Sequence, residues 1–116
     1  MYVPDDVGLA QLSTNDNEPP APGQHRSSVV TQTLGGHVDA APIEPHISTR
    51  PFADAAGYLI CSDGLTDAVR DAAITAILRS HDGGAAAFEL WKATIAAGAP
   101  DNMTVALVEI ATHAET

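Results

Sequence analysis

Two aspartates in this sequence stand where a predicted strand meets a turn. Asp63 follows an apolar run, residues 58–61, with one serine between them, and Asp101 comes just before a second run rich in β-branched side chains, residues 103–110. If the two strands pair antiparallel, the end of one and the start of the other share one edge of the sheet. Two carboxylates so close repel each other unless a cation lies between them or one is protonated. Oxygen ligands suit hard cations, so the pair is a candidate site for Mg²⁺ or Mn²⁺.

Both aspartates also have a purely structural interpretation. An aspartate after a strand can cap the next helix, and one that follows a proline can shape a turn. Gly64 fits the metal interpretation, because a residue without a Cβ lets the chain turn sharply beside an ion. The spacing of these residues leaves both interpretations open.

The pattern of apolar side chains predicts the elements that position these residues. The near-continuous apolar run 58–61 indicates a strand covered on both faces, and 103–110 indicates a second strand. Spacings of three and four between apolar residues predict a short helix from Leu65 and a second helix with Asp71 as its N-cap. A third helix is expected over about residues 85–97.

The third helix is expected to turn one apolar side to the core. Gly98 is a natural residue to end this helix, and Pro100 blocks its continuation. The side chains expected on the apolar side are Phe88, Leu90, Trp91 and Ile95.

The first half of the chain is less regular. Residues 2–12 indicate two short strands around a turn, and the proline-rich stretch 13–28 indicates a loop. Residues 29–34 predict either a short strand or a helical turn. Residues 43–49 resemble an exposed strand, placed at a sheet edge by Pro45. With a frayed tail at 111–116, the whole pattern predicts a mixed α/β fold in which antiparallel pairing is possible.

The composition excludes some classes of partner. Five basic and fifteen acidic residues give a net charge of −10, which argues against nucleic acid and against an anionic membrane surface. No apolar run approaches the roughly 18 residues that a membrane span needs. The single cysteine, Cys61, cannot form a disulfide within the chain, which is compatible with a reducing cytoplasm.

Other residue types that can do chemistry have simpler interpretations. Cys61 is best read as a small core residue. Ser62 lacks the Gly-x-Ser-x-Gly context of a hydrolase nucleophile, and a solvated helix face accounts for Asp67. No metal-ligand spacing relates the histidines, which are expected at the surface: His25, His37, His46, His81 and His113.

The amino-acid sequences around the two aspartates make the metal-site interpretation more specific. "LICSDGLTDAV" and "APDNMTVALVEI" resemble the C-terminal half of the metal-dependent protein phosphatase family (PPM, type 2C). In that family a strand ends in Ser-Asp-Gly-Leu, and a later Asp-Asn-(Ile/Met)-Thr-Val opens the last core strand. The resemblance implies that Asp63 and Asp101 are ligands of a binuclear Mg²⁺ or Mn²⁺ centre, with Gly64 and Asn102 in support.

The resemblance extends beyond these motifs. It covers nearly the whole chain, is specific at 60–66 and 100–108, and is weaker before residue 27. Asn102 favours the bacterial Ser/Thr phosphatase branch over the sigma-factor-regulating phosphatases, whose last motif usually reads Asp-Asp. The implied fold is the C-terminal part of an α-β-β-α sandwich with mainly antiparallel sheets, an α/β (α+β) arrangement.

The resemblance implies a metal-dependent protein serine/threonine phosphatase that acts on phosphoproteins through a metal-activated water. The family's earlier metal-binding motifs and its phosphate-gripping arginine match nothing here, and neither Arg26 nor Arg50 fits. Residues 1–116 are therefore expected to form a partial domain that binds Mn²⁺ weakly and hydrolyses little or no phosphoester alone. Its exposed sheet surface would favour low stability, self-association or pairing with a complementary N-terminal half.

Two other functions stay open. The chain can be a catalytically inactive phosphatase-like module that binds phosphoproteins or assembles with another chain. It can also be an unrelated acidic α/β domain that carries the two motifs by chance. In that last case Asp63→Ala would leave metal binding unchanged.

Overall fold

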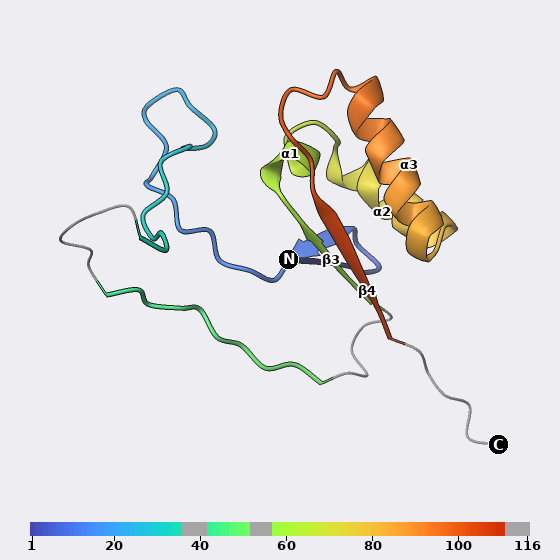
Figure 1. Cartoon of the computed structure of the whole chain (residues 1–116), viewed down its shortest axis with the longest axis horizontal. Helices are drawn as coiled ribbons and strands as arrows, with labels where there is room; N and C mark the ends of the chain where they lie inside the picture. Colours follow the sequence, from blue (N-terminus) through green and yellow to red (C-terminus); the bar gives the residue numbers. More distant parts are fainter. Residues whose placement is uncertain (36–41, 52–56, 111–116) are drawn as a thin grey trace. The chain divides into compact units, whose positions relative to one another are not determined.

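Four short strands pair into one antiparallel sheet in the computed structural model, which describes residues 1–35, 42–51 and 57–110 (Figure 1). The strand order is β2-β1-β3-β4. The elements along the chain are β1 (Tyr2–Pro4), β2 (Leu9–Gln11), β3 (Gly57–Cys61), α1 (Asp63–Thr66), α2 (Asp71–Ser80), α3 (Gly83–Ala96) and β4 (Val105–Glu109). This mixed, antiparallel architecture confirms the predicted fold class.

The long pairing between β3 and β4 organises the sheet. It runs from Gly57 opposite Glu109 to Cys61 opposite Val105. The antiparallel pairing on which a shared edge for Asp63 and Asp101 depends is therefore present. The β1–β2 hairpin is also confirmed. Its turn is closed by Asp5, whose Oδ1 accepts hydrogen bonds from the main-chain N–H groups of Val7 and Gly8 at 2.9 and 2.7 Å.

The core lies between one face of this sheet and the helices. Its buried apolar residues are Leu59, Leu65, Val69, Ile74 and Leu90. Side chains alternate between the two faces of a strand, and β3 shows this clearly. Leu59 is fully buried, whereas Ile60 is 46% exposed. The prediction that both faces of this strand are covered is wrong for the described residues, because helices pack on one face alone.

The helices begin earlier than predicted. α1 starts at Asp63 instead of Leu65. Asp71 is the first residue of α2, whose N-cap is Arg70. α3 starts at Gly83, where the carboxylate of Glu109 accepts the main-chain N–H. The side chain that caps this helix start comes from β4, so the start could not be predicted from the neighbouring sequence.

The inward side of α3 also differs from the prediction. Leu90 is buried, but Phe88, Trp91 and Ile95 are each about half exposed. Ala86 and Thr94 face the core with Leu90 at a spacing of four residues. Thr94 tolerates burial because its Oγ1 donates a hydrogen bond to the carbonyl oxygen of Leu90 at 3.0 Å. As predicted, Gly98 ends the helix region in a left-handed conformation, with φ +96°.

Residues 13–49 make up a separate compact unit. Side chains hold its described part together, since Asp16 Oδ1 lies 2.8 Å from both Gln32 Nε2 and His46 Nε2. The hydrogen bond from His46, followed by that from Gln32, lowers the pKa of Asp16. The edge strand predicted at 43–49 is absent. At Glu44 the side chain of Gln32, and not a neighbouring strand, bonds both main-chain polar groups.

Three further predictions concern residues 29–34, the C-terminal tail and membrane-spanning segments. Residues 29–34 form only an isolated bridge, between Val30 and Asn17. The tail predicted at 111–116 lies outside the described residues. Among the helices that the structure describes, none has both the length and the apolar character to cross a membrane.

Candidate metal site

The pairing of β3 with β4 places Asp63 and Asp101 at the same end of the sheet. Beyond the last strand pair, the N–H of Ser62 donates to the carbonyl oxygen of Thr104 at 3.0 Å. Asp63 is the next residue and opens α1, while Asp101 lies in the loop that leads into β4. Both aspartates are exposed, so a cation could reach them from solvent.

Gly64 brings the two segments into main-chain contact. A Cβ built on this glycine would lie 2.1 Å from the carbonyl oxygen and 2.8 Å from the carbonyl carbon of Asn102. Real Cβ atoms do not approach backbone so closely, and any side chain here would push the segments apart. Gly64 does not have a positive φ. Close approach, and not the sharp turn expected from the sequence, is what requires glycine.

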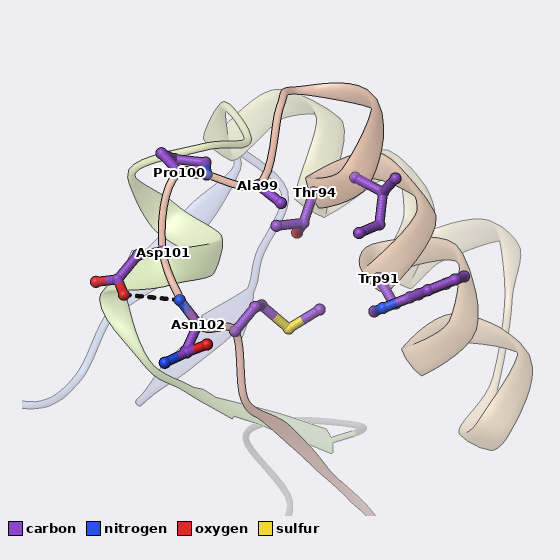
Figure 2. Close-up of a pocket in the computed structure, with 8 residues that line it drawn as sticks. Trp91, Thr94, Ala99, Pro100, Asp101 and Asn102 are labelled. Carbon is purple, nitrogen blue, oxygen red and sulfur yellow. Dashed lines mark hydrogen bonds between the residues drawn. The ribbon is translucent and has the colours of Figure 1, made fainter.

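The loop before β4 has a strained backbone. Gly98 and Ala99 have φ values of +96° and +42°, and a residue with a Cβ costs about 1–2 kcal/mol in this left-handed region. Pro100 follows. Asp101 Oδ1 then accepts the N–H of Asn102 at 2.7 Å, so its carboxylate has a defined direction (Figure 2).

A cavity of about 470 Å³ lies on the other side of this loop. Figure 2 shows Trp91 and Thr94 of α3 along it, while the Asp101 carboxylate points away from Trp91. The eight lining residues are Trp91, Thr94, Ile95, Ala99, Pro100, Asp101, Asn102 and Met103. Asp101 thus lines this hollow, but its carboxylate points away from Trp91.

Cys61 lies just before the site, at the end of β3. Burial raises the pKa of its thiol, and the nearby Asp63 carboxylate acts in the same direction. The reactive form of cysteine is the thiolate. A partly buried thiol with a raised pKa, packed against the core, agrees with the interpretation of Cys61 as a core residue.

The two aspartates offer the type of ligand atom that a hard cation prefers, but two ligand residues are too few for a complete site. Carboxylate oxygens are the side-chain ligands that Mg²⁺ and Mn²⁺ prefer. Within residues 1–35, 42–51 and 57–110, no group of three or more His, Cys, Asp or Glu side chains gathers that could hold a metal. Asp63 and Asp101 can thus supply part of a metal site, and further ligands must come from elsewhere or from water.

Ser62 is the residue of this region that the sequence interpretation missed. Its hydroxyl accepts the N–H of Thr104 at 3.0 Å and donates to the carbonyl oxygen of Asn102 at 3.4 Å. The sequence signal for Ser62 is its place between an apolar strand and an acidic residue. From the sequence, Ser62 was considered only as a nucleophile.

Comparison with known proteins shows that part of this chain is similar in sequence to a bacterial protein. No family model matches. The chain is 32% identical over 83 residues to the serine/threonine protein phosphatase PstP of two Mycobacterium tuberculosis strains, CDC 1551 / Oshkosh and ATCC 25618 / H37Rv. The match covers 72% of this chain and 15% of the length of those proteins.

The structural comparison agrees with the sequence match. The crystal structure of the M. tuberculosis serine/threonine phosphatase PstP/Ppp superposes with a TM-score of 0.71 at 27% identity. The superposition covers 94% of this chain and 50% of the solved one. The fold described above is thus similar to half of the solved phosphatase chain.

Proposed function

Because the chain is homologous over part of its length to the bacterial serine/threonine phosphatase PstP of the metal-dependent (PPM) family, we propose that it serves in phosphoprotein dephosphorylation. Asp63 and Asp101 are the proposed ligands of a binuclear Mg²⁺ or Mn²⁺ centre. The observation that carries the proposal is the β3–β4 pairing, which puts both aspartates at one end of the sheet. The substrates are proposed to be phosphoserine and phosphothreonine residues of proteins in the cytoplasm.

Metal ions at such a centre supply an activated water and hold the phosphoryl oxygens. The residues of this chain provide direction and spacing. The first residue of α1 carries one carboxylate, and the N–H of Asn102 orients the other. Gly64 keeps the two segments in contact. These features support Gly64 and Asn102 as the residues that hold the two ligands in place.

The chain by itself is proposed to have little or no turnover. Mg²⁺ needs close to six oxygen ligands, and a binuclear site needs more than two carboxylates can share. Catalysis then requires the remaining ligands from a complementary part of the phosphatase domain. With wild-type residues 1–116, we expect no metal-dependent hydrolysis of p-nitrophenyl phosphate above the rate in buffer.

A second candidate function is a phosphatase-like binding or regulatory module. The observation that favours it is the side of α3 turned away from the core. There Phe88 and Trp91 stack with ring centroids 5.5 Å apart and remain about half exposed. Exposed apolar surface can mark an interaction site, tryptophan is enriched at binding hot spots, and Trp91 also lines the cavity beside the loop. This function needs no complete metal centre.

Local metal binding tests the proposed site in the full 116-residue chain. Paramagnetic Mn²⁺ broadens the NMR signals of nearby amides, so we expect titration to broaden Gly64 and Asn102 first. Asp63→Asn or Asp101→Asn should weaken this effect by about tenfold or more, because each removes a charged ligand. Asp71→Asn on α2 is the matched control, since it removes one exposed carboxylate elsewhere. Equal broadening in all three variants would exclude the metal site and leave the binding-module function.

A further inference from the structure

The end of the β3–β4 ladder has an unusual acceptor. After the Cys61–Val105 pair, the N–H of Ser62 still donates to the carbonyl oxygen of Thr104. The reciprocal bond does not use the carbonyl of Ser62. That carbonyl accepts the N–H of Leu65 at 3.3 Å, in the first turn of α1. The hydroxyl of Ser62 takes its place and accepts the N–H of Thr104 at 3.0 Å.

The same hydroxyl also reaches the residue next to Asp101. It donates to the carbonyl oxygen of Asn102 at 3.4 Å, so one oxygen holds main-chain groups on both sides of Met103. Of the small side chains, only a hydroxyl both donates and accepts in this way. The carbonyl of Asn102 is also the group against which Gly64 packs.

We propose that Ser62 is a positioning residue, whose hydroxyl clamps segment 102–104 so that Asp101 stays at the same end of the sheet as Asp63. This inference rests on the proposed metal site. Strand β4 starts only at Val105, and the bond from the Ser62 N–H to the Thr104 carbonyl extends the pairing by one residue, so residues 101–103 lie beyond it. Without the hydroxyl, the N–H of Thr104 loses its acceptor and the carbonyl of Asn102 loses a donor, so the loop that carries Asp101 is held less firmly. Groups that orient metal ligands typically change metal affinity by about 10–100-fold when removed.

Substitution of Ser62 by threonine and by valine isolates the hydroxyl. The two side chains have nearly the same shape, and only threonine keeps the oxygen. In the full chain we expect Ser62→Thr to retain the slow hydrogen exchange of the Thr104 amide, and Ser62→Val to lose it. The Mn²⁺ concentration that half-broadens Gly64 and Asn102 should rise about tenfold in Ser62→Val and return toward the wild-type value in Ser62→Thr.

A stability control separates positioning from general destabilisation. Glu109→Ala removes an acceptor at the start of α3 and leaves the Ser62 hydrogen bonds in place. If this control weakens Mn²⁺ binding as much as Ser62→Val, the positioning role is wrong. Equal Mn²⁺ affinities of Ser62→Val and Ser62→Thr would also overturn the positioning role. If Ser62→Val does not fold, Ser62→Ala takes its place in this comparison.

The aspartate variants keep the two hypotheses apart. If Asp63→Asn abolishes the local broadening while Ser62→Val binds like the wild type, the metal site stands and the positioning role fails. If Asp63→Asn has no effect, the metal site fails and the role of Ser62 falls with it.

Discussion

At the scale of single residues, one glycine decides how closely the two acidic segments approach. Gly64 is buried against the main chain of Asn102, and there is no room for a Cβ at this position. Glycine is usually unfavourable in a helix because it lacks a side chain and is conformationally free. Here the contact with the loop before β4 offsets that cost.

The substitution Gly64→Ala tests this contact. The added methyl group must displace the Asn102 carbonyl, so we expect a loss of about 1–3 kcal/mol in the free energy of unfolding. Urea denaturation followed by the fluorescence of Trp91, the single tryptophan, measures this change. Gly84→Ala is the control, because nothing lies within 4 Å of its Cβ position, and alanine there should be neutral or stabilising by up to about 1 kcal/mol. Equal effects of the two substitutions would show that close approach is not important at Gly64.

At the scale of elements, the start of α3 depends on a strand distant in sequence. The first N–H groups of a helix have no partner within it, and α3 has no side-chain cap from its N-cap residue, Asp82. Glu109 at the end of β4 accepts the N–H of Gly83 instead. A negative charge at this end of a helix is also favourable toward the helix dipole. The helix and the strand are thus linked at the end of the sheet opposite Asp63.

The substitution Glu109→Ala is expected to destabilise the chain by about 1 kcal/mol, the usual cost of a lost N-cap. Glu109→Gln keeps an acceptor without the charge and should cost less. Thermal or urea unfolding measures both, with Glu89→Ala as the control. Glu89 forms an i,i+3 ion pair with Lys92 on the helix surface, and such a pair is worth about 0.2–0.5 kcal/mol. A stability unchanged in Glu109→Ala would mean that α3 begins without this cap.

At the scale of the whole molecule, the sheet has a second face that the described helices do not cover. The register puts Tyr58 beside Val108 and Ile60 beside Ala106 on this face. Ile60 and Val108 are 46% and 44% exposed. Exposed apolar sheet surface favours association, and the solved phosphatase chain is twice as long as the part that this chain matches. Both facts support the prediction of self-association or of pairing with a complementary half.

Sedimentation tests that prediction on the 116-residue chain alone. We expect concentration-dependent association of the wild type, and a shift toward monomer in Ile60→Glu, because a charge on the apolar face disfavours contact between copies. Val7→Glu is the matched control, since Val7 is 98% exposed at the hairpin turn and lies outside the strands of the sheet. A monomeric wild type with a sharp two-state melt would contradict the prediction.

The amino-acid sequence by itself determined the elements with strong local patterns. The β1–β2 hairpin, strands β3 and β4, and the helices between them follow from apolar spacing and turn residues, although helix starts shifted by one or two residues. It also determined that Asp63 and Asp101 share an edge, provided that their strands pair antiparallel. The elements depend on neighbours in the chain, whereas the shared edge depends also on the pairing of β3 with β4, which are distant in sequence.

Only the tertiary structure decided which surfaces are covered and which distant groups meet. It showed that Phe88, Trp91 and Ile95 lie partly in solvent while Thr94 is buried. It also showed that Ser62 and Glu109 bind main-chain groups far away in sequence. Residues that are 26 to 42 positions apart in these contacts have no local signal that pairs them. Their meeting follows from how the sheet and helices pack, because burial and long-range hydrogen bonds are properties of the assembled fold.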